Sequence, residues 1–458
     1  MLDAVVIGGG IAGLTTGFRL AQAGLDVRVL EADKAAGGHA RSTSVGGFLL
    51  ERGPHSFPGS AHALWQLIAD LKMDDAVLAA TPGSRNRYIV RDGRPQAIPL
   101  GPGSFVASRL LSPLGKIRLL TEPLVRSDAQ PEGSVWQFFV RRFGWEAATY
   151  LLAPFVSGTY GGDARQLGAR AAFPRFYALE ANHGSMLKGA LRTALQARRR
   201  TRREGGSPRR GTYSFRDGIG QLAHVLSGRL AQRLQTGVAV QTLQQDNSLG
   251  WQVLTDDAEH RCRTVVLALP PDRAAAVLGS VAAASAELLR LIPLSPIAVV
   301  YWAAALRRHP APGFGLLVPP SESLRVLGTL FPSQLFSGRA PDGNELFASF
   351  YGGITDAAAL DLKDRQLEAL VKEEHARILG LPIERVRVLG VVRHRRAIPQ
   401  LLPSHPELIQ QIESDLAAKP GLFLAGNYLT GVSVDHAVGS GITAASRTRA
   451  FLCGGRAS

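Results

Sequence analysis

The chain begins with two short apolar runs separated by a glycine-rich turn and a stretch of helical period. Residues 4–7 and most of 26–30 are apolar, as buried strands are, and residues 11–22 place apolar side chains three and four positions apart. Gly24 follows this stretch, as a glycine often follows the last turn of a helix. The pattern predicts a strand, helix, strand unit, whose two strands lie parallel in one sheet.

The period changes further along the chain. A mostly helical stretch is expected over 61–195. Three strands are expected over 237–242, 251–254 and 264–269, and an amphipathic helix over 360–379. Residues 421–450 return to the strand, turn and helix of the beginning. Two similar ends around a different middle predict one discontinuous domain that carries insertions.

Length and composition limit the class of protein. A chain of 458 residues exceeds what one hydrophobic core usually serves, so two or three domains are expected. Two cysteines, Cys262 and Cys453, are too few for a disulfide framework and favour a reducing, cytoplasmic setting. A strand that begins at Ala4 leaves no room for a cleavable signal peptide, and the most apolar window, 291–306, is too short and too interrupted by proline to span a membrane.

The charge balance is strongly basic. Lysine and arginine number 52 against 37 acidic residues, which gives a formal net charge of +15. This favours an anionic partner, either nucleic acid, an acidic membrane surface or a substrate with carboxylates, although a genomic bias toward arginine would produce the same excess. Seven arginines lie in 197–210 among Gly, Ser and Pro, which predicts a solvated loop and no nucleic-acid-binding arm.

A dinucleotide fingerprint occupies the first turn. Three glycines have the spacing G-x-G-x-x-G between the predicted strand and helix, where they permit a tight turn, close approach of a pyrophosphate and close packing of helix on strand. Glu31 ends the second strand at the spacing of an acid that binds a ribose hydroxyl. The residues expected to contact the dinucleotide here are Gly8, Gly10, Ile11, Ala12, Gly13, Glu31 and Ala32.

Further motifs distinguish FAD from NAD. A second glycine pair followed by an arginine comes after the ribose acid, then Gly-Pro-His at 53–55, and near the other end lie 422–427 and 431–434. In this order they resemble the flavin amine-oxidase and desaturase superfamily, in which a valine of an internal strand meets the adenine. The resemblance implies FAD as the cofactor and adds as contacts Gly37, Gly38, Arg41, Gly53, Pro54, His55, Val238, Gly426, Asn427, Val432, Ser433 and Val434.

The middle of the chain narrows the resemblance. Six segments, 53–57, 86–94, 155–163, 313–319, 327–331 and 350–353, resemble the protoporphyrinogen oxidase family in sequence and in order. The fold expected is α/β: a discontinuous Rossmann-like FAD-binding domain, a substrate domain with a mixed sheet, and a helical insertion. The boundaries expected are 1–80, 211–272 and 385–458 for the FAD-binding domain, 81–100 and 273–384 for the substrate domain, and 101–210 for the insertion.

The resemblance implies a six-electron oxidation of protoporphyrinogen IX to protoporphyrin IX in haem biosynthesis, with molecular oxygen reoxidising the flavin to give hydrogen peroxide. Arg87 would pair with a substrate propionate, as a guanidinium suits a carboxylate. The other expected substrate contacts are Gly158, Leu317, Leu330 and Phe350. Neither a catalytic side chain nor a metal ligand is expected, because the flavin accepts hydride and the histidines lack metal-ligand spacing.

Several alternatives stay open. The substrate could be coproporphyrinogen III, which has two propionates where protoporphyrinogen has vinyl groups. An amine oxidase would place a lysine near the flavin, yet none lies between Lys188 and Lys363, and Ala298 stands about where that lysine is expected. A carotenoid desaturase and a flavin-bearing scaffold without turnover are the remaining rivals. In the family the region around 105–125 meets the membrane, so peripheral attachment to the cytoplasmic membrane is expected. The alternative is that this region is an ordinary helix packed on the core. A homodimer is also left open.

Overall fold

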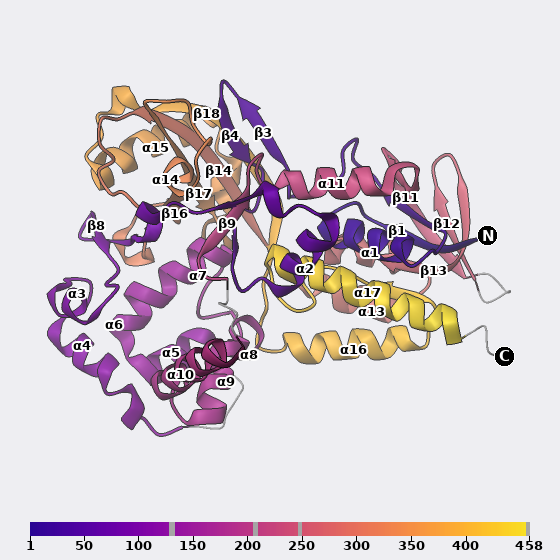
Figure 1. Cartoon of the computed structure of the whole chain (residues 1–458), viewed down its shortest axis with the longest axis horizontal. Coiled ribbons are helices and arrows are strands. Elements are labelled where there is room, and N and C mark those ends of the chain that lie inside the picture. Colours follow the sequence, from indigo (N-terminus) through magenta and orange to yellow (C-terminus); the bar gives the residue numbers. More distant parts are fainter. Residues whose placement is uncertain (128–132, 205–208, 246–249, 455–458) are drawn as a thin grey trace.

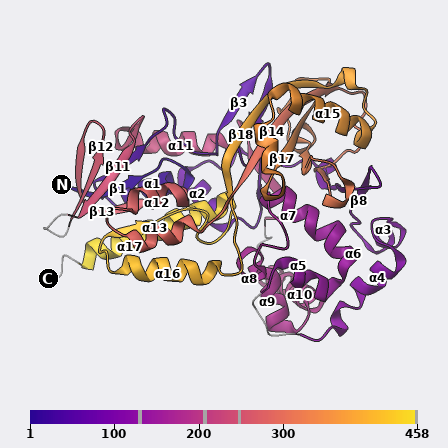
Figure 2. The same ribbon diagram turned by 180° about the vertical axis from the view of Figure 1, so that it is seen from behind.

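The structure is a computed structural model of the chain, and it describes residues 1–127, 133–204, 209–245 and 250–454. Figure 1 shows a first sheet with helices on both faces at the right, a second sheet at the upper left and a group of helices at the lower left. Both termini lie at the right-hand end, and Figure 2 shows the same arrangement from behind.

The first sheet contains the predicted strand, helix, strand unit. Its strands, in spatial order, are β10 (Leu234–Thr236), β2 (Val27–Glu31), β1 (Leu2–Ile7), β13 (Glu259–Leu267), β12 (Trp251–Thr255) and β11 (Val240–Gln245), and β19 (Leu422–Leu424) also pairs with β13. β1 is parallel to β2 and β13, as the sequence predicts for the first pair, whereas β11 and β12 form an antiparallel hairpin. One face packs on α1 (Ile11–Gln22), α2 (His62–Leu71), α11 (Gly220–Leu230) and α17 (Val434–Gly454), and the other on α12 (Pro271–Leu278), α13 (Ala283–Arg290) and α16 (His405–Ala417).

The second sheet is mixed. Its order is β18 (Arg387–Pro399), β14 (Leu294–Ala305), β17 (Asn344–Gly352), β16 (Gly328–Leu330), β15 (Gly315–Leu317), β7 (Arg87–Arg91) and β8 (Arg94–Ala97). α15 (Asp364–Leu379) covers one face through a buried cluster that includes Val90, Leu316, Phe331 and Tyr351. The opposite face, which we call the slot face, packs on Phe48 and Leu50, and Arg91 on it lies over the ring of Tyr150 in the region 101–210.

Smaller elements connect these layers. The short strands are β3 (Ser42–Val45), β4 (Phe48–Glu51), β5 (Phe57–Pro58), β6 (Val77–Ala79) and β9 (Thr212–Phe215). The 3-10 and π turns are η1 (Asp74–Ala76), η2 (Pro82–Arg85), η3 (Glu122–Leu124), η4 (Ala148–Leu152), η5 (Ala231–Arg233), η6 (Pro320–Glu322), η7 (Ile354–Asp361) and η8 (Ile383–Arg385), and α14 is Pro332–Leu335.

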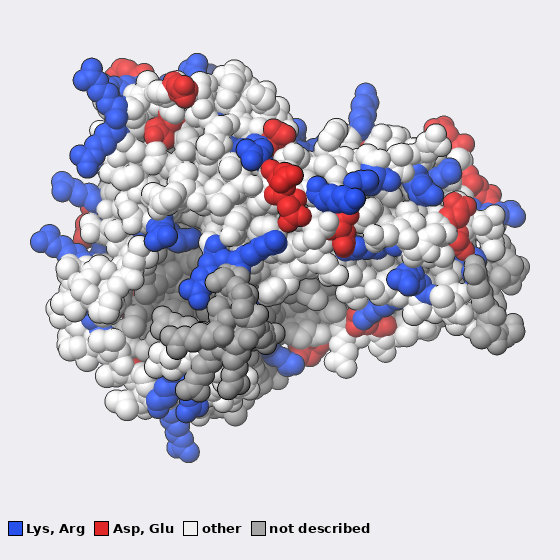
Figure 3. Space-filling model, viewed as in Figure 1, with Lys and Arg blue, Asp and Glu red and all other residues white. Residues whose placement is uncertain are grey.

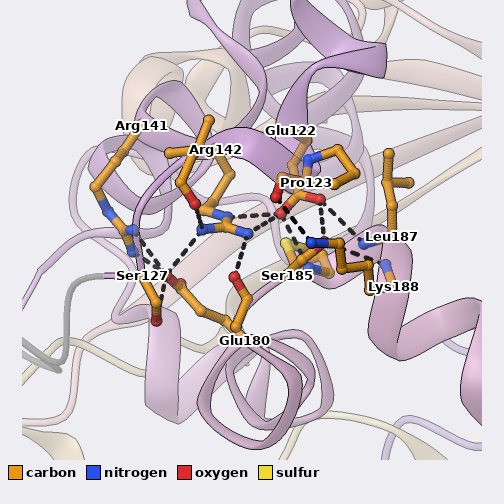
Figure 4. Close-up of polar contacts among 12 residues, drawn as sticks. Glu122, Pro123, Ser127, Arg141, Arg142, Glu180, Ser185, Leu187 and Lys188 are labelled. Carbon is orange, nitrogen blue, oxygen red and sulfur yellow. Dashed lines mark hydrogen bonds and ion pairs between the residues drawn. The ribbon is translucent and has the colours of Figure 1, made fainter.

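The helices at the lower left of Figure 1 are held together by buried charge. They are α3 (Pro102–Ala107), α4 (Pro113–Leu120), α5 (Val135–Phe143), α6 (Trp145–Ala147), α7 (Ala153–Tyr160), α8 (Ala169–Ala172), α9 (Pro174–His183) and α10 (Met186–Glu204). Figure 4 shows Arg142 of α5 between Glu122 of η3 and Glu180 of α9. Glu122 also accepts hydrogen bonds from the N–H groups of Met186 and Leu187, which fixes the start of α10.

The structure corrects four expectations. The loop predicted over 197–210 is helical as far as Glu204, because α10 continues through the arginines, and 205–208 lie outside the described residues. The amphipathic helix begins at Asp364 and not at 360, the helical stretch from 61 is interrupted by β6, β7 and β8, and β11 begins only at Val240. No helix in the described ranges is long and apolar enough to cross a membrane; the apolar window 291–306 forms strand β14.

The three-part division of the chain remains a proposal. Strand β18 pairs with β14 in the second sheet, so residues 387–399 join that sheet although the expected boundary placed them with the cofactor domain. We propose that the last segment of the cofactor domain begins after this strand.

Candidate functional site

The fingerprint turn is shaped by contacts that exclude side chains. Gly8 has φ +107°, and a Cβ there would lie 2.4 Å from the carbonyl oxygen of Ala268. A Cβ on Gly13 would lie 1.9 Å from the carbonyl oxygen of Gly8, so the helix α1 packs directly on the turn. A Cβ on Gly10, by contrast, would meet no atom within 4 Å. The turn is therefore closed beneath and open above the start of α1, where backbone N–H groups attract a phosphate.

Glu31 stands beside this turn. Its carboxylate accepts hydrogen bonds from the N–H groups of Gly9 at 2.7 Å and of Asp33 at 2.8 Å, which fixes its orientation. Remaining lone pairs on both oxygens can accept ribose hydroxyls. Ala32 follows it, and the backbone N–H of Val238 donates to the carbonyl of Glu31 at 2.9 Å, so the strand expected at the adenine lies beside the ribose acid.

The second glycine pair joins the same turn. Gly37 donates its N–H to the carbonyl of Gly9 at 2.7 Å and forms an isolated bridge with Gly10, and Gly38 has φ +58°. Arg41 bonds Asp33 at 2.5 Å, yet its Nε is buried with no hydrogen-bond partner among the described residues. An unsatisfied guanidinium N–H beside an open glycine turn fits a bound pyrophosphate, so these residues fit a dinucleotide cofactor.

The motif at the far end of the chain reaches the same helix. The carbonyl of Gly441 in α17 accepts from Thr16 of α1, and a Cβ on Gly441 would lie 2.4 Å from the carbonyl of Ala12, next to Ile11. Before α17, Gly426 donates to Ser440 and the amide of Asn427 to the carbonyl of Val432. Ser433 bonds His436 just before the helix begins at Val434. The structure thus brings the N-terminal and C-terminal motifs together.

The slot face carries the expected substrate residues in two rows across its strands. Strand register places Arg87, Gly315, Leu330, Ala348 and Tyr301 in one row, and Ile89, Leu317, Gly328, Phe350 and Val299 in the next. The first row alternates larger side chains with small ones, and in the second Gly328 separates Leu317 from Phe350, which leaves hollows at the small residues. Leu317, Leu330 and Phe350 are only partly buried, as side chains lining a slot are.

Helix α7 covers part of this face. A Cβ on Gly158 would lie 2.3 Å from Cδ2 of Leu317, so only glycine lets the helix approach so closely. The carbonyl of Gly161, at the end of α7, accepts from Ser295 at 2.8 Å and from the N–H of Ile354 at 2.8 Å, which ties the helix to the second sheet. Figure 3 shows a hollow between the second sheet and the helices below it, with Lys and Arg atoms beside it.

A buried polar junction links the slot to the cofactor motifs. Tyr301 donates its hydroxyl hydrogen to the carbonyl of Glu51, two residues before Gly53, and its hydroxyl oxygen lies 3.2 Å from Nε2 of His55. The ring of His55 meets Phe350 edge to face at 5.8 Å. Burial, with a smaller effect of Arg339, lowers the pKa of His55 to about 3, so the imidazole stays neutral. Burial raises the pKa of the Glu51 carboxyl to about 7.

Arg87 lies exposed at the other end of its row. Its guanidinium stands 4.6 Å from the centroid of the Phe314 ring, and no acidic partner is found for it in the described part of the chain. A cation held over an aromatic ring without a carboxylate is free to bind an anionic group.

Sequence reasoning missed part of this site and misplaced one residue. Tyr301, Gly315 and Gly328 face the slot, but a tyrosine and two glycines in strands give no signal until the register is known. Ala298 is buried on the opposite face, toward α15, so its side chain points away from the slot. Val299 and Tyr301, on the slot face, are the neighbours that point toward the site.

Comparison with known proteins agrees with this geometry. The family described as flavin containing amine oxidoreductase matches residues 11–448. Protoporphyrinogen oxidase 2, chloroplastic/mitochondrial, of Arabidopsis thaliana is 30% identical over 98% of this chain and 94% of its own length. Coproporphyrinogen III oxidase of Bacillus subtilis is 25% identical, with 98% of each chain covered.

Solved structures share the fold. A crystal structure from Exiguobacterium sp. 255-15 superposes with a TM-score of 0.84 at 21% identity, covering 99% of each chain. Putrescine oxidase bound to putrescine gives a TM-score of 0.70 at 16% identity, covering 98% of this chain and 99% of the other. At these identities the likeness extends to the fold alone.

Proposed function

We propose, from the premise that this chain belongs to the flavin-containing amine oxidoreductase family, that it oxidises protoporphyrinogen IX to protoporphyrin IX. The chain is an FAD-dependent oxidoreductase. The observation that carries the proposal is the pair of slot-face rows, which runs from an unpaired arginine over apolar side chains to the junction with the cofactor motifs.

The cofactor would be held by backbone more than by side chains. The glycine turn and the start of α1 would hold the pyrophosphate, with Arg41 at its edge, and Glu31 the ribose. The segment between β10 and β11 that contains Val238 would meet the adenine, and Gly426, Asn427 and 432–434 would hold the flavin end beside 53–55. When bound, FAD supplies the acceptor for the hydride of each two-electron step, three of which make the six-electron oxidation.

The chain's own residues would bind, orient and shield the macrocycle. Arg87 would bind a propionate, Phe350 would stack on a pyrrole ring, and Leu317 and Leu330 would enclose another, while Gly158 would let the backbone of α7 approach the macrocycle. The neutral His55 and the committed Tyr301 hydroxyl close the far end without introducing a charge. A substrate that gains aromaticity when it is oxidised requires little more from the protein than orientation in a site that excludes water. We propose molecular oxygen as the final acceptor, with hydrogen peroxide as its product.

Coproporphyrinogen III is the second candidate substrate, since a coproporphyrinogen III oxidase is among the relatives. Protoporphyrinogen IX carries two carboxylates, and coproporphyrinogen III carries four. The apolar Leu330, Phe350 and Val299 favour the substrate with two, because an unpaired carboxylate in that position would lose its hydration without compensation.

The test is oxidation of both porphyrinogens by the purified holoprotein, followed by porphyrin fluorescence. We expect a larger kcat/KM for protoporphyrinogen. Arg87→Ala should raise KM by a factor that corresponds to about 1.5–3 kcal/mol, the range for a charge-assisted hydrogen bond, with an unchanged flavin spectrum. Arg233→Ala, at an exposed arginine of η5, is the control for loss of charge. Absence of porphyrin from both substrates would refute the function, and an unchanged KM would remove Arg87 from the site.

We also propose that α3, α4 and η3 bind the surface of an anionic membrane. Six apolar side chains of this region are more than half exposed: Leu100, Val106, Leu114, Ile117, Leu120 and Leu124. Lys116 and Arg118 lie among them, and apolar side chains flanked by cations suit an anionic bilayer. Vesicles with and without anionic lipid test this: Leu114→Glu should abolish binding, whereas binding that does not depend on lipid charge, or its absence, would contradict it.

A further inference from the structure

A pocket of 570 Å³ opens beside the edge strand β8, and no role has so far been given to it. It is lined by Asn86, Gln96, Ala97, Ile98, Pro99, Leu100, Ser104, Ala107, Ser108 and Arg109. No aspartate or glutamate is among these residues. A pocket with one cation, several polar groups and no acid suits a carboxylate.

The pocket lies at the end of the slot face. Gln96 is opposite Ile89 in the β7 and β8 pair, so it extends the second slot-face row over the edge strand. The N–H of Ile98 donates to the carbonyl of Arg87 at 2.8 Å, which places the pocket wall next to the arginine expected to bind a propionate. Arg91 donates to the carbonyl of Leu110, which holds the segment after α3 on the same face.

The pocket contains an uncommitted cation. Arg109 is exposed, and the structure shows no ion pair or hydrogen bond for its guanidinium within the described ranges. Its neighbour Arg91, by contrast, pairs with Glu146 at 3.3 Å, and Arg118 donates to two backbone carbonyls of α5. Ser108 accepts from the N–H of Leu110 at 3.1 Å, and its own hydroxyl hydrogen can still be donated.

We propose that this pocket, through Arg109, binds a second carboxylate of the same porphyrinogen whose first carboxylate binds Arg87. This rests on the proposed function and deepens it. Two arginines at one end of the slot select a macrocycle that carries carboxylates on two neighbouring rings. Protoporphyrinogen IX has both propionates at one edge, so both would be paired while its vinyl-bearing rings lie over Leu330 and Phe350.

At the opposite end of the slot, beside His55, the guanidinium of Arg339 is buried and already bonded. It donates to the carbonyls of Phe215 and Arg216 and to Ser214. His55 is kept neutral by its burial. Neither group is therefore free to pair with carboxylates at the second edge of a substrate, and the KM of a substrate with carboxylates at both edges should be the higher one.

The experiment uses the holoprotein and separates this inference from the proposed function. KM and kcat are measured for protoporphyrinogen IX, coproporphyrinogen III and protoporphyrinogen IX dimethyl ester in the wild type, Arg109→Gln, Arg109→Lys and the control Arg233→Gln. The dissociation constant of protoporphyrin IX, followed by its fluorescence, gives a readout that does not depend on turnover.

Arg109→Gln should raise KM for protoporphyrinogen about tenfold with kcat unchanged, and should weaken protoporphyrin binding by a similar factor. Arg109→Lys should recover part of the loss, and the dimethyl ester should not distinguish the variants, because it carries no carboxylate. A wild type that oxidises no porphyrinogen overturns the proposed function and this inference with it. A wild type that does so, beside an Arg109→Gln variant with unchanged KM and unchanged porphyrin binding, overturns this inference alone.

Discussion

Arg142→Met tests how the buried charges hold the helices of 101–210. Arg142 and Glu122 are both fully buried, and Arg142 also bonds Glu180 at 3.2 Å and the carbonyls of Val125 and Gly184 at 3.2 and 3.0 Å. Methionine fills a similar volume without the charge, so Glu122 would stay in the interior without its cation. Removing one partner of a buried ion pair costs about 3–5 kcal/mol, against about 0–1 kcal/mol for an exposed pair.

Hydrogen exchange at backbone amides is the right assay, since a chain of this size need not unfold in one step. A loss of about 3–5 kcal/mol corresponds to opening that is roughly 150 to 5000 times more frequent, which should appear in α5, α9 and α10 and not in β1 or α1. Arg447→Met, which breaks the exposed pair with Glu413, is the matched control.

The double variant Glu122→Leu/Arg142→Met should recover much of this loss, leaving about 1 kcal/mol for the hydrogen bonds of Glu122 to the start of α10. Exchange in α5 and α10 within threefold of the wild type in the single variant would refute the reasoning.

Three more predictions concern the site. Burial raises the pKa of Glu51 to about 7, so the protonated carboxyl stabilises the native state. This contribution is complete at a pH below the ordinary pKa of glutamate and is lost as the pH rises through about 7. Glu51→Gln should remove up to about 3 kcal/mol of that pH dependence, measured as Tm between pH 4 and 8. Gly13→Val should fold but purify without flavin, and native circular dichroism with a full yellow spectrum would contradict it. Gly158→Ala should raise the porphyrinogen KM about tenfold through contact with Leu317, and adding Leu317→Ala to this variant should relieve the contact. Equal KM values in the wild type, the single variant and the double variant would count against the slot.

The fingerprint turn was predictable because its signals are local. Strand β1, helix α1 and Glu31 follow one another within 31 residues, so apolar period and glycine spacing determine them together. The pairing of β1 with β13, across more than 250 residues, is set by packing that no local pattern encodes. The residues of this turn could thus be proposed as cofactor contacts from sequence, while the sheet that carries them could be named only as a class.

The slot was predictable only in part for a related reason. Resemblance supplied Arg87, Leu317, Leu330 and Phe350 one by one, but their assembly depends on β7 pairing with β15 more than 220 residues later. Tyr301 entered the site through that register alone. The arginines after 197 misled the prediction because their charge suggested a solvated loop, whereas arginine has a high helix propensity and Glu122 fixes the first turn of α10.

The junction at Tyr301 joins the second sheet to the segment 51–55, which carries three of the expected cofactor contacts. Its hydroxyl donates its only hydrogen to the carbonyl of Glu51, so Nε2 of His55 must supply the hydrogen between the two rings. His55 therefore presents Nδ1 as an uncharged acceptor, and Phe350 packs against the same ring. The edge of the slot nearest the cofactor motifs is fixed by the second sheet and the segment 51–55 together. Its roof, α7, is anchored at Gly161 and approaches the sheet only where Gly158 allows it. We therefore propose that the roof sets substrate size and the sheet substrate orientation, so changes at Gly158 and at Arg87 should affect different properties of the same reaction.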